Sequence, residues 1–363
     1  MNPQKIIVSV ILLAAVVGGI VYLNSQKASR SGGESVEVKT SINKEEKLAR
    51  YEPAKEITTP DGFINTDGKP VTIGEFIGKK VILVDFWTYS CINCQRTTPY
   101  LNAWYEKYKD KGLVIIGIHT PEFEFEKIYQ NVLDATERMG IKYPVVLDND
   151  YSTWTAYQNR FWPRKYLIDI DGFIVYNHIG EGAYEETEKK IQETLSERQA
   201  LLGESGTISQ PLTKEISIQN GAKSPEIYFG ASRNERLGNG AQGTLGVQNF
   251  TQPKNISPNT LYLDGQWDIT DEYAENKGVA KITFRYKAQY VYMVASAENT
   301  VRVKILIDGL AIQTPGKDVD ENGFITIQKD QLYTLVAGLG SEEHILEIII
   351  ENPGLRAFTF TFG

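Results

Sequence analysis

The chain has 363 residues and a formal net charge of −8, with 41% hydrophobic and 23% charged residues. This composition is typical of an ordinary globular protein of about two domains. A negative net charge without a basic run argues against a nucleic-acid partner. Two cysteines are too few for a disulfide scaffold, and His119, His178 and His344 lie too far apart in sequence to suggest a metal site. We therefore expect neither a metal nor a cofactor.

An apolar run from residue 6 to residue 23 lies near the start of the chain, with Lys5 before it and Lys27 and Arg30 after it. As a helix it would be about 27 Å long, close to the thickness of a bilayer's hydrocarbon core. A cleaved signal peptide is the alternative, although the run is longer than a usual signal core and no A-x-A-like site follows it. We expect residues 1–24 to be an uncleaved, single-pass membrane anchor that exports the following domains from the cytoplasm.

The rest of the chain changes character at three points. Residues 25–55 are polar and charged, and they predict a tether with a short helix near 45–51. Strand and helix patterns alternate over residues 56–203, which indicates a layered α/β domain. A polar linker is expected at 204–224, and the short strands separated by turn residues over 225–363 predict an all-β sandwich resembling a jelly roll.

The α/β domain has a readable order of elements. We expect a hairpin over 62–71 around an Asp-Gly turn and a second hairpin formed by 166–170 and 173–178. Strands are predicted at 81–86, 113–118 and 143–147, and helices at 91–109, 125–139, 152–157 and 185–202. In the second domain the predicted strands are 281–286, 290–295, 301–307, 324–328, 344–350 and 357–362.

The only two cysteines, Cys91 and Cys94, follow the apolar strand directly, where a helix begins. A C-x-x-C sequence in this position is typical of a reversible redox dithiol. The free N–H groups at a helix N-terminus favour an anion, which makes Cys91 the expected nucleophile. Cys94 lies one turn later on the same face, at a spacing compatible with a disulfide between the two. An inert structural disulfide and a zinc site are the alternatives.

Residues at fixed offsets from this pair make the first domain resemble a thioredoxin fold and the TlpA-like extracytoplasmic thiol–disulfide oxidoreductases. Asp85, six residues before Cys91, stands where thioredoxin has a buried acid. Pro99 matches the proline that kinks the active-site helix. Trp162-Pro163 resembles the cis-proline that faces the dithiol in this fold.

Three further segments resemble the periplasmic part of the DipZ proteins over about residues 56–363. They are WTYSCINC at 87–94, HTPEF at 119–123 and the final FTFG. The resemblance implies disulfide-bearing protein substrates and a role in cytochrome c maturation or general disulfide reduction. Here a single anchor replaces the electron-conducting membrane domain, so a separate donor of the CcdA type is expected. Because Ile92-Asn93 replaces the Gly-Pro of thioredoxin, the redox potential is not carried over.

Two acids are candidate catalytic groups. Asp85 lies in an apolar strand, and a carboxyl beneath Cys94 could move that thiol's proton during resolution. A pair with Lys80 is the alternative for Asp85. Glu122 follows the 113–118 strand, and the resemblance implies that an acid there approaches the dithiol, although loop carboxylates are usually just solvated. His119 is expected to be a satisfied histidine at a strand end.

A substrate-binding rim is expected around the dithiol. Trp87, Tyr89 and Trp162 would form its apolar surface, although each could equally be core packing. As a cis-proline, Pro163 would leave the backbone of Trp162 free to pair with an extended substrate chain. A turn proline is the alternative for Pro163.

Two other functions remain open at this point. The β domain could bind glycan through Tyr228, Tyr262 and Trp267 while the dithiol only senses redox state, although core aromatics are the simpler interpretation. A peroxiredoxin-type peroxidase shares the fold, and Thr88-Tyr89-Ser90-Cys91 fits its Thr-x-x-Cys setting loosely. The favoured interpretation is a membrane-anchored thiol–disulfide oxidoreductase.

Overall fold

The structure, a computed structural model, describes residues 44–208, 223–340 and 342–363. Helix α2, Lys44–Arg50, belongs to one compact unit that ends at Arg50, and a second unit runs from Tyr51 to Gly363. The short helix predicted near 45–51 is confirmed. The predicted anchor and most of the predicted tether and linker lie outside the described residues. Among the helices that are described, none has the length and hydrophobicity needed to cross a membrane.

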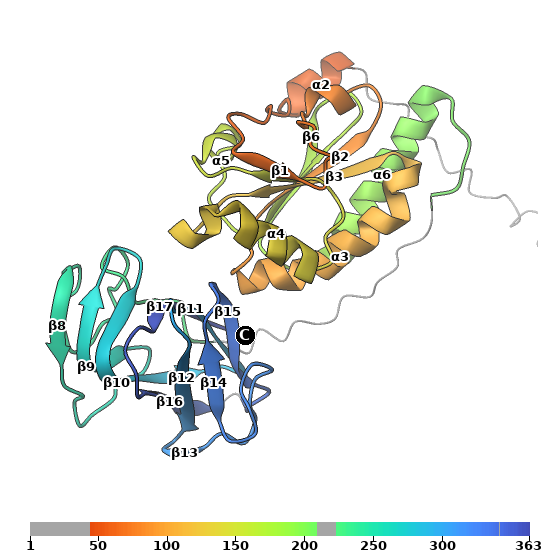
Figure 1. Ribbon diagram of the computed structural model, residues 1–363. Helices are drawn as coiled ribbons and strands as arrows, with labels where there is room; N and C mark the ends of the chain where they lie inside the picture. Colours follow the sequence, from red (N-terminus) through yellow and green to blue (C-terminus); the bar gives the residue numbers. More distant parts are fainter. Residues whose placement is uncertain (1–43, 209–222, 341) are drawn as a thin grey trace, which may run out of the picture. The chain divides into compact units, whose positions relative to one another are not determined.

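A six-stranded sheet forms the centre of the α/β domain, in the order β1-β4-β3-β2-β5-β6 (Figure 1). The strands are β1 Gly62–Ile64, β2 Val81–Trp87, β3 Leu113–His119, β4 Val145–Leu147, β5 Arg164–Ile168 and β6 Ile174–Ile179. Strands β2, β3 and β4 are parallel to one another, and the others pair antiparallel. All seven residues of β2 are buried, as expected for an apolar central strand.

Side chains of β2 alternate between two cores, because successive residues of a strand point to opposite faces. Val81, Leu83 and Trp87 pack into the core that includes helical residues of α3, α4 and α6. Ile82, Val84 and Phe86 pack into the core on the other face. The helices are α3 Ile92–Tyr108, α4 Tyr129–Arg138, α5 Ser152–Ala156 and α6 Tyr184–Leu202, with short 3-10 turns η1 Gly74–Phe76, η2 Lys109–Lys111 and η3 Glu124–Lys127. Asp85 therefore belongs to the face covered by α3.

The hairpin predicted over 62–71 is wrong. Strand β1 pairs antiparallel with β4, and no strand is present at 69–71. The predicted Asp67-Gly68 turn is present, and both residues have positive φ, but no strand returns from it. Pro70 cannot donate a ladder hydrogen bond. The second predicted hairpin is confirmed by β5 and β6.

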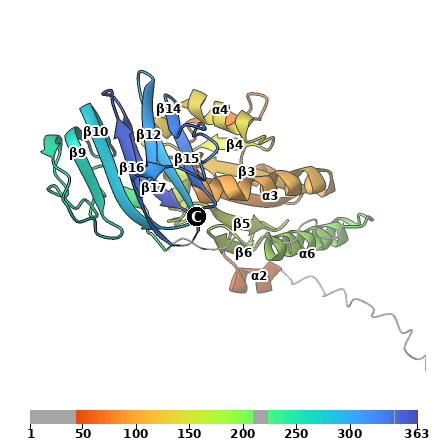
Figure 2. The same ribbon diagram turned by 90° about the horizontal axis from the view of Figure 1, so that it is seen from below.

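The C-terminal domain is all-β, as predicted, but its strands form one curled sheet rather than the two sheets of a jelly roll (Figure 2). They are β7 Ile227–Tyr228, β8 Gly246–Phe250, β9 Leu261–Ile269, β10 Ala274–Lys287, β11 Tyr290–Ser296, β12 Val301–Ile307, β13 Leu310–Ala311, β14 Phe324–Ile327, β15 Gln331–Ala337, β16 Glu343–Ile350 and β17 Arg356–Phe362. The 14-residue β10 pairs with β9, β16 and β17, and a register shift between Asn276 and Ala280 interrupts its pairing with β9. In the strand order of the sheet, β10 lies between β16, which leads to β12 and β13, and β17, which leads to β11 and β15.

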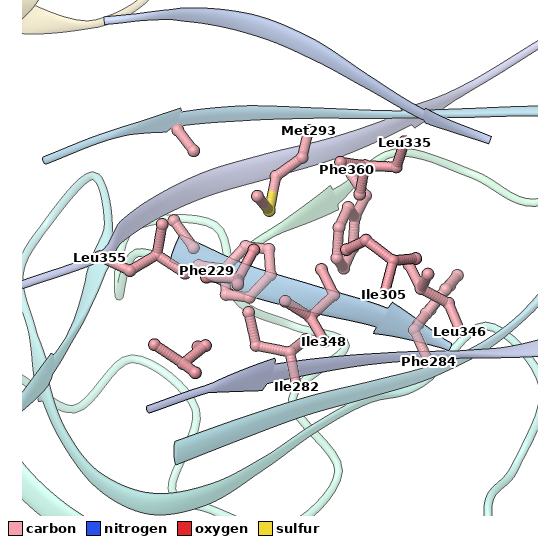
Figure 3. Packing of buried hydrophobic residues seen from close by; sticks show 14 of the residues in the cluster. Phe229, Ile282, Phe284, Met293, Ile305, Leu335, Leu346, Ile348, Leu355 and Phe360 are labelled. Atoms are coloured by element: carbon pink, nitrogen blue, oxygen red, sulfur yellow. The ribbon is translucent and has the colours of Figure 1, made fainter. Parts of the chain in front are cut away.

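The curled sheet encloses its own hydrophobic core (Figure 3). Met293, Leu335 and Phe360 extend into it from one side, and Ile282 and Ile348 from the other. All five are completely buried. The domain therefore has a core independent of the α/β domain.

Two aromatic contacts connect the β domain to the loop after β3. The ring of Phe358 on β17 meets the rings of Phe123 and Phe125 edge-on, at centroid distances of 5.1 and 4.8 Å. Tyr292 and Val294 of β11 belong to the same buried cluster as these rings. The β domain therefore helps to hold the loop that leads from β3 toward α4.

Candidate active site

Cys91 lies where β2 ends and α3 begins, and it is the N-cap residue of α3. Its Sγ accepts a hydrogen bond from the backbone N–H of Cys94 at 3.4 Å. Cys91 is half-buried and Cys94 is buried, so Cys91 has the more accessible sulfur. Both are free thiols in the structure, and the disulfide between them stays a prediction.

Beneath this pair lies Asp85, whose carboxyl group interacts electrostatically with Cys94. Burial raises the pKa of the Cys94 thiol well above its ordinary value, and its hydrogen bond with Cys91 adds to the effect. Burial also raises the pKa of Asp85 to about 7, although the positive charge of Lys165 opposes the shift. Asp85 Oδ1 has no hydrogen-bond partner within the described residues. An acid that titrates near neutrality can accept the Cys94 proton, and this role remains a prediction.

Asp85 faces Lys165 rather than Lys80. Lys165 lies directly opposite Asp85 in the antiparallel pairing of β2 with β5. It is completely buried, its Nζ donates to the carbonyl of Gly180 at 3.3 Å, and burial lowers its pKa. Sequence reasoning missed Lys165, because it lies beside Arg164 at the start of β5, just before the predicted strand 166–170.

Glu126 is a second buried acid near the dithiol, and sequence reasoning missed it as well. Its Oε1 accepts hydrogen bonds from the Ser90 hydroxyl at 2.6 Å and the Ser90 N–H at 3.2 Å. Its Oε2 accepts from the N–H groups of Glu122 at 2.6 Å and Phe123 at 3.1 Å. Burial raises the pKa of Glu126 to about 7, against the effect of the Ser90 hydrogen bond. Glu126 thus joins the loop after β3 to the residue that precedes Cys91.

The Glu122 carboxylate is held by the β domain. Its Oε1 accepts from Arg233 Nη1 at 2.7 Å and from the Tyr228 hydroxyl at 3.0 Å. The Arg233 guanidinium also lies 3.8 Å from the centroid of the Tyr228 ring. Because Glu122 is separated from Arg233 by 111 positions, no local pattern indicated this arrangement.

Only part of the predicted rim is present. Trp162 is half-buried beside Cys91, whose thiol donates weakly to the Trp162 carbonyl at 3.9 Å. The Trp162–Pro163 bond is cis, as predicted. Trp87 and Tyr89 are 2% and 1% exposed, so their prediction as rim residues is wrong. Both rings pack against His119 in the core, because the strand and turn that carry them lie beneath the surface.

Three residues considered for other roles are also buried. His119 is completely buried, and burial lowers its pKa to about 3, so it is neutral near neutral pH. A peroxidase would need Thr88 beside Cys91. Thr88 is buried instead, and its Oγ1 lies 3.5 Å from Nε2 of His119. Trp267 is completely buried in the core of the β domain and therefore presents no surface for a glycan.

A pocket of about 340 Å³ opens beside Cys91. The residues that the α/β domain contributes to its lining include Cys91, Glu122 and Trp162. The β domain contributes Glu226, Tyr228, Arg233, Val294, Thr359 and Thr361. Tyr228, considered above as a glycan contact, is thus part of the wall next to the dithiol. The two domains together shape the space in front of Cys91.

A cluster of three acidic residues could hold a cation. Asp169, Asp171 and Glu197 have carboxylate oxygens within 4.8 Å of one another. Asp169 already accepts the backbone N–H groups of Asp171 and Phe173. This cluster includes no residue of the pocket lining.

Two family models together match most of the described chain. Residues 52–195 match the Redoxin family, and residues 224–363 match the family described as thioredoxin-like C-terminal domain. Protein DipZ of Mycobacterium tuberculosis is 36% identical over 316 residues, which are 84% of this chain and 43% of DipZ. The chain therefore spans less than half the length of that relative.

Shorter proteins match about two fifths of the chain or less. A solution structure of a thioredoxin-like protein in the oxidized form is 26% identical, over 40% of this chain and 97% of that protein, with a TM-score of 0.38. The thiol-disulfide oxidoreductase ResA of Bacillus cereus is 34% identical over 132 residues, which are 36% of this chain and 73% of ResA. Since ResA is matched over most of its length at this identity, the chain belongs to the thioredoxin-like thiol–disulfide oxidoreductases.

Proposed function

We propose that this oxidoreductase reduces or exchanges disulfides of proteins outside the cytoplasm, with Cys91 as the attacking thiol. The observation that carries the proposal is the pairing of an accessible sulfur with a buried one. Cys91 is half-buried at the edge of a pocket, while Cys94 lies behind it and donates its N–H to the Cys91 sulfur. Such an arrangement favours attack by Cys91 and resolution by Cys94.

The proposed cycle has two exchange steps. The Cys91 thiolate attacks one sulfur of the substrate disulfide, forms a mixed disulfide and releases the other sulfur as a thiolate. Cys94 then loses its proton to Asp85 and attacks the Cys91 sulfur, which releases the second substrate thiol. The protein is left with the Cys91–Cys94 disulfide, and two electrons have passed to the substrate. A membrane donor of the CcdA type then supplies two electrons and restores the dithiol.

Insulin reduction with an external dithiol tests the cycle. Cys91→Ser should lower the rate to background, whereas Cys94→Ser should accumulate a mixed disulfide that mass spectrometry detects. Ser196→Ala, on the exposed side of α6, is the matched control and should retain the wild-type rate. Activity that survives Cys91→Ser contradicts the assignment of the nucleophile.

Membrane attachment needs a separate test, because it depends on residues 1–24. The full chain should sediment with membranes, and a chain starting at residue 25 should not. The location of the domains follows from the protease sensitivity of the full chain in intact cells and in lysed cells. A full chain that stays in the soluble fraction contradicts the anchor.

A further inference from the structure

The pocket beside Cys91 carries more charge than disulfide exchange itself requires. Its lining contains the acids Glu122 and Glu226 and the bases Arg160 and Arg233. Thiol–disulfide exchange uses only sulfur atoms and a proton acceptor. Charged groups of this lining are therefore candidates for selecting which disulfide reaches Cys91.

Two of the four charges neutralise each other. Arg233 and Glu122 form an ion pair at 2.7 Å, and the Glu122 side chain is only 14% exposed. The Tyr228 hydroxyl also donates to Glu122, which leaves this pair with little capacity for a ligand. The pair closes one wall of the pocket without giving it a net charge.

Within the described residues, neither of the other two charged groups, Arg160 and Glu226, forms an ion pair. Arg160 is exposed in the loop before Trp162, and neither an ion pair nor a hydrogen bond engages its side chain. Glu226 is exposed, and its Oε2 lies 2.9 Å from the Tyr228 hydroxyl, whose single proton it shares with Glu122. Glu226 also interacts with the Thr361 side chain and is attracted by Arg233. The lining thus offers one positive and one negative group that are not in an ion pair, Arg160 from the α/β domain and Glu226 from the β domain.

We propose that this pocket recognises amino-acid disulfides of the cystine type, in which each half carries both an ammonium and a carboxylate. Arg160 binds the carboxylate and Glu226 binds the ammonium, because a ligand that carries both charges satisfies both groups at once. A volume of about 340 Å³ is also large enough for a small molecule. The proposal adds a small-molecule substrate and rests on the proposed dithiol cycle.

The reaction with cystine balances in the same way as the proposed cycle. The Cys91 thiolate attacks one cystine sulfur, and the first cysteine leaves as a thiolate that takes up a proton. Cys94 attacks Cys91 and releases the second cysteine. One cystine becomes two cysteines, and the protein dithiol becomes the Cys91–Cys94 disulfide, which the external dithiol or the membrane donor reduces again.

The test is a single-turnover rate series with the pre-reduced protein and four small disulfides. Cystine carries both charges, cystamine is a dication, 3,3′-dithiodipropionate is a dianion, and bis(2-hydroxyethyl) disulfide is neutral. Each rate is divided by the rate of free dithiothreitol with the same disulfide, which removes differences in intrinsic reactivity. The normalised rate with cystine should exceed the normalised rate with the neutral disulfide by about tenfold, because each of two exposed charge contacts should raise the rate by about threefold.

Two variants separate the contacts. Relative to the rate with the neutral disulfide, Arg160→Gln should lower the rates of reduction of cystine and of the dianion by about threefold. Glu226→Gln should lower the rates of reduction of cystine and of the dication by a similar factor. The matched controls, Arg302→Gln and Glu193→Gln, change exposed charges that are not part of the pocket lining. Salt at about 0.5 M should reduce the preference for cystine, because it screens exposed charges.

The outcomes distinguish this inference from the proposed function. Equal normalised rates for all four disulfides, or variants that slow all four equally, overturn the cystine-type specificity while insulin reduction persists. A pre-reduced protein that reduces neither insulin nor any of the four disulfides overturns both proposals together.

Discussion

Two buried carboxyl groups lie close to the dithiol, and their surroundings differ. Asp85 lies on the central strand, where Oδ1 has no hydrogen-bond partner within the described residues. Glu126 lies in the loop after β3 and accepts four hydrogen bonds, two from Ser90 and two from the backbone of its own loop. Burial raises the pKa of each group to about 7.

This comparison predicts that Asp85 is a proton acceptor and that Glu126 is a structural tie. A carboxyl with an unoccupied oxygen next to a buried thiol can exchange a proton without breaking other bonds. A carboxylate that already accepts four hydrogen bonds would lose them on moving, so it holds the main chain in place. Equal pKa values therefore do not imply equal roles. Four predictions test the difference.

Replacing Glu126 should have the largest effect on stability. Glu126→Ala leaves the hydroxyl and three N–H groups without their acceptor and should lower the free energy of unfolding by about 5 kcal/mol. Urea unfolding measures the change. Glu193→Ala, an exposed acid on α6, is the control and should have little effect. A loss below about 1 kcal/mol would contradict the tie.

The β domain should support the Glu126 side of the site. Phe358→Ala removes the ring that packs on Phe123 and Phe125, and should cost about 4 kcal/mol in the free energy of unfolding. Because Asp85 lies on the central strand, away from this contact, the pH midpoint of disulfide reduction should stay unchanged. Leu310→Ala, which is 70% exposed on β13, is the control. A shifted midpoint would show that the two regions are coupled.

The stability of the protein should depend on pH through Asp85. Its carboxyl binds a proton on folding between the reference pKa of 3.8 and the folded pKa of about 7, so the free energy of unfolding falls as pH rises through that window. Asn cannot titrate, and the stability of Asp85→Asn relative to wild type should increase by about 3 kcal/mol from about pH 4 to about pH 7.

Other groups cancel in this difference. Glu126 has the same slope as Asp85, and His119, whose pKa is lowered to about 3, has the opposite slope, but both titrate in the two proteins alike. Urea unfolding at several pH values measures the two profiles. Parallel profiles would mean that Asp85 titrates in the folded protein at its ordinary pKa.

The smallest predicted effect is on the rate. Asp85→Asn should slow disulfide reduction by about tenfold at neutral pH, since Cys94 loses its proton acceptor. The deficit should shrink toward about pH 9, where solvent hydroxide can deprotonate Cys94. The measurement is the pH–rate profile of insulin reduction, with the exposed Asp134→Asn on α4 as control. A deficit that does not vary with pH would argue against proton transfer.

Local pattern, together with the family resemblance, predicted the centre of the molecule. The apolar β2, the cysteines at its junction with α3, and the buried acid at a fixed offset lie within fourteen residues, 81–94. The β5–β6 hairpin was similarly readable, because its turn joins strands that are neighbours in the sequence. Such features depend on short-range geometry, which a residue pattern records directly.

Contacts between distant residues decided the rest. Lys165 meets Asp85 through strand pairing, and Arg233 and Tyr228 meet Glu122 across more than one hundred positions. The burial of Trp87 and Tyr89 and the curling of the β sheet likewise arise only when the elements pack together. A single sequence specifies which side chains are charged or apolar, but the folded chain determines which of them lose water and which meet a partner.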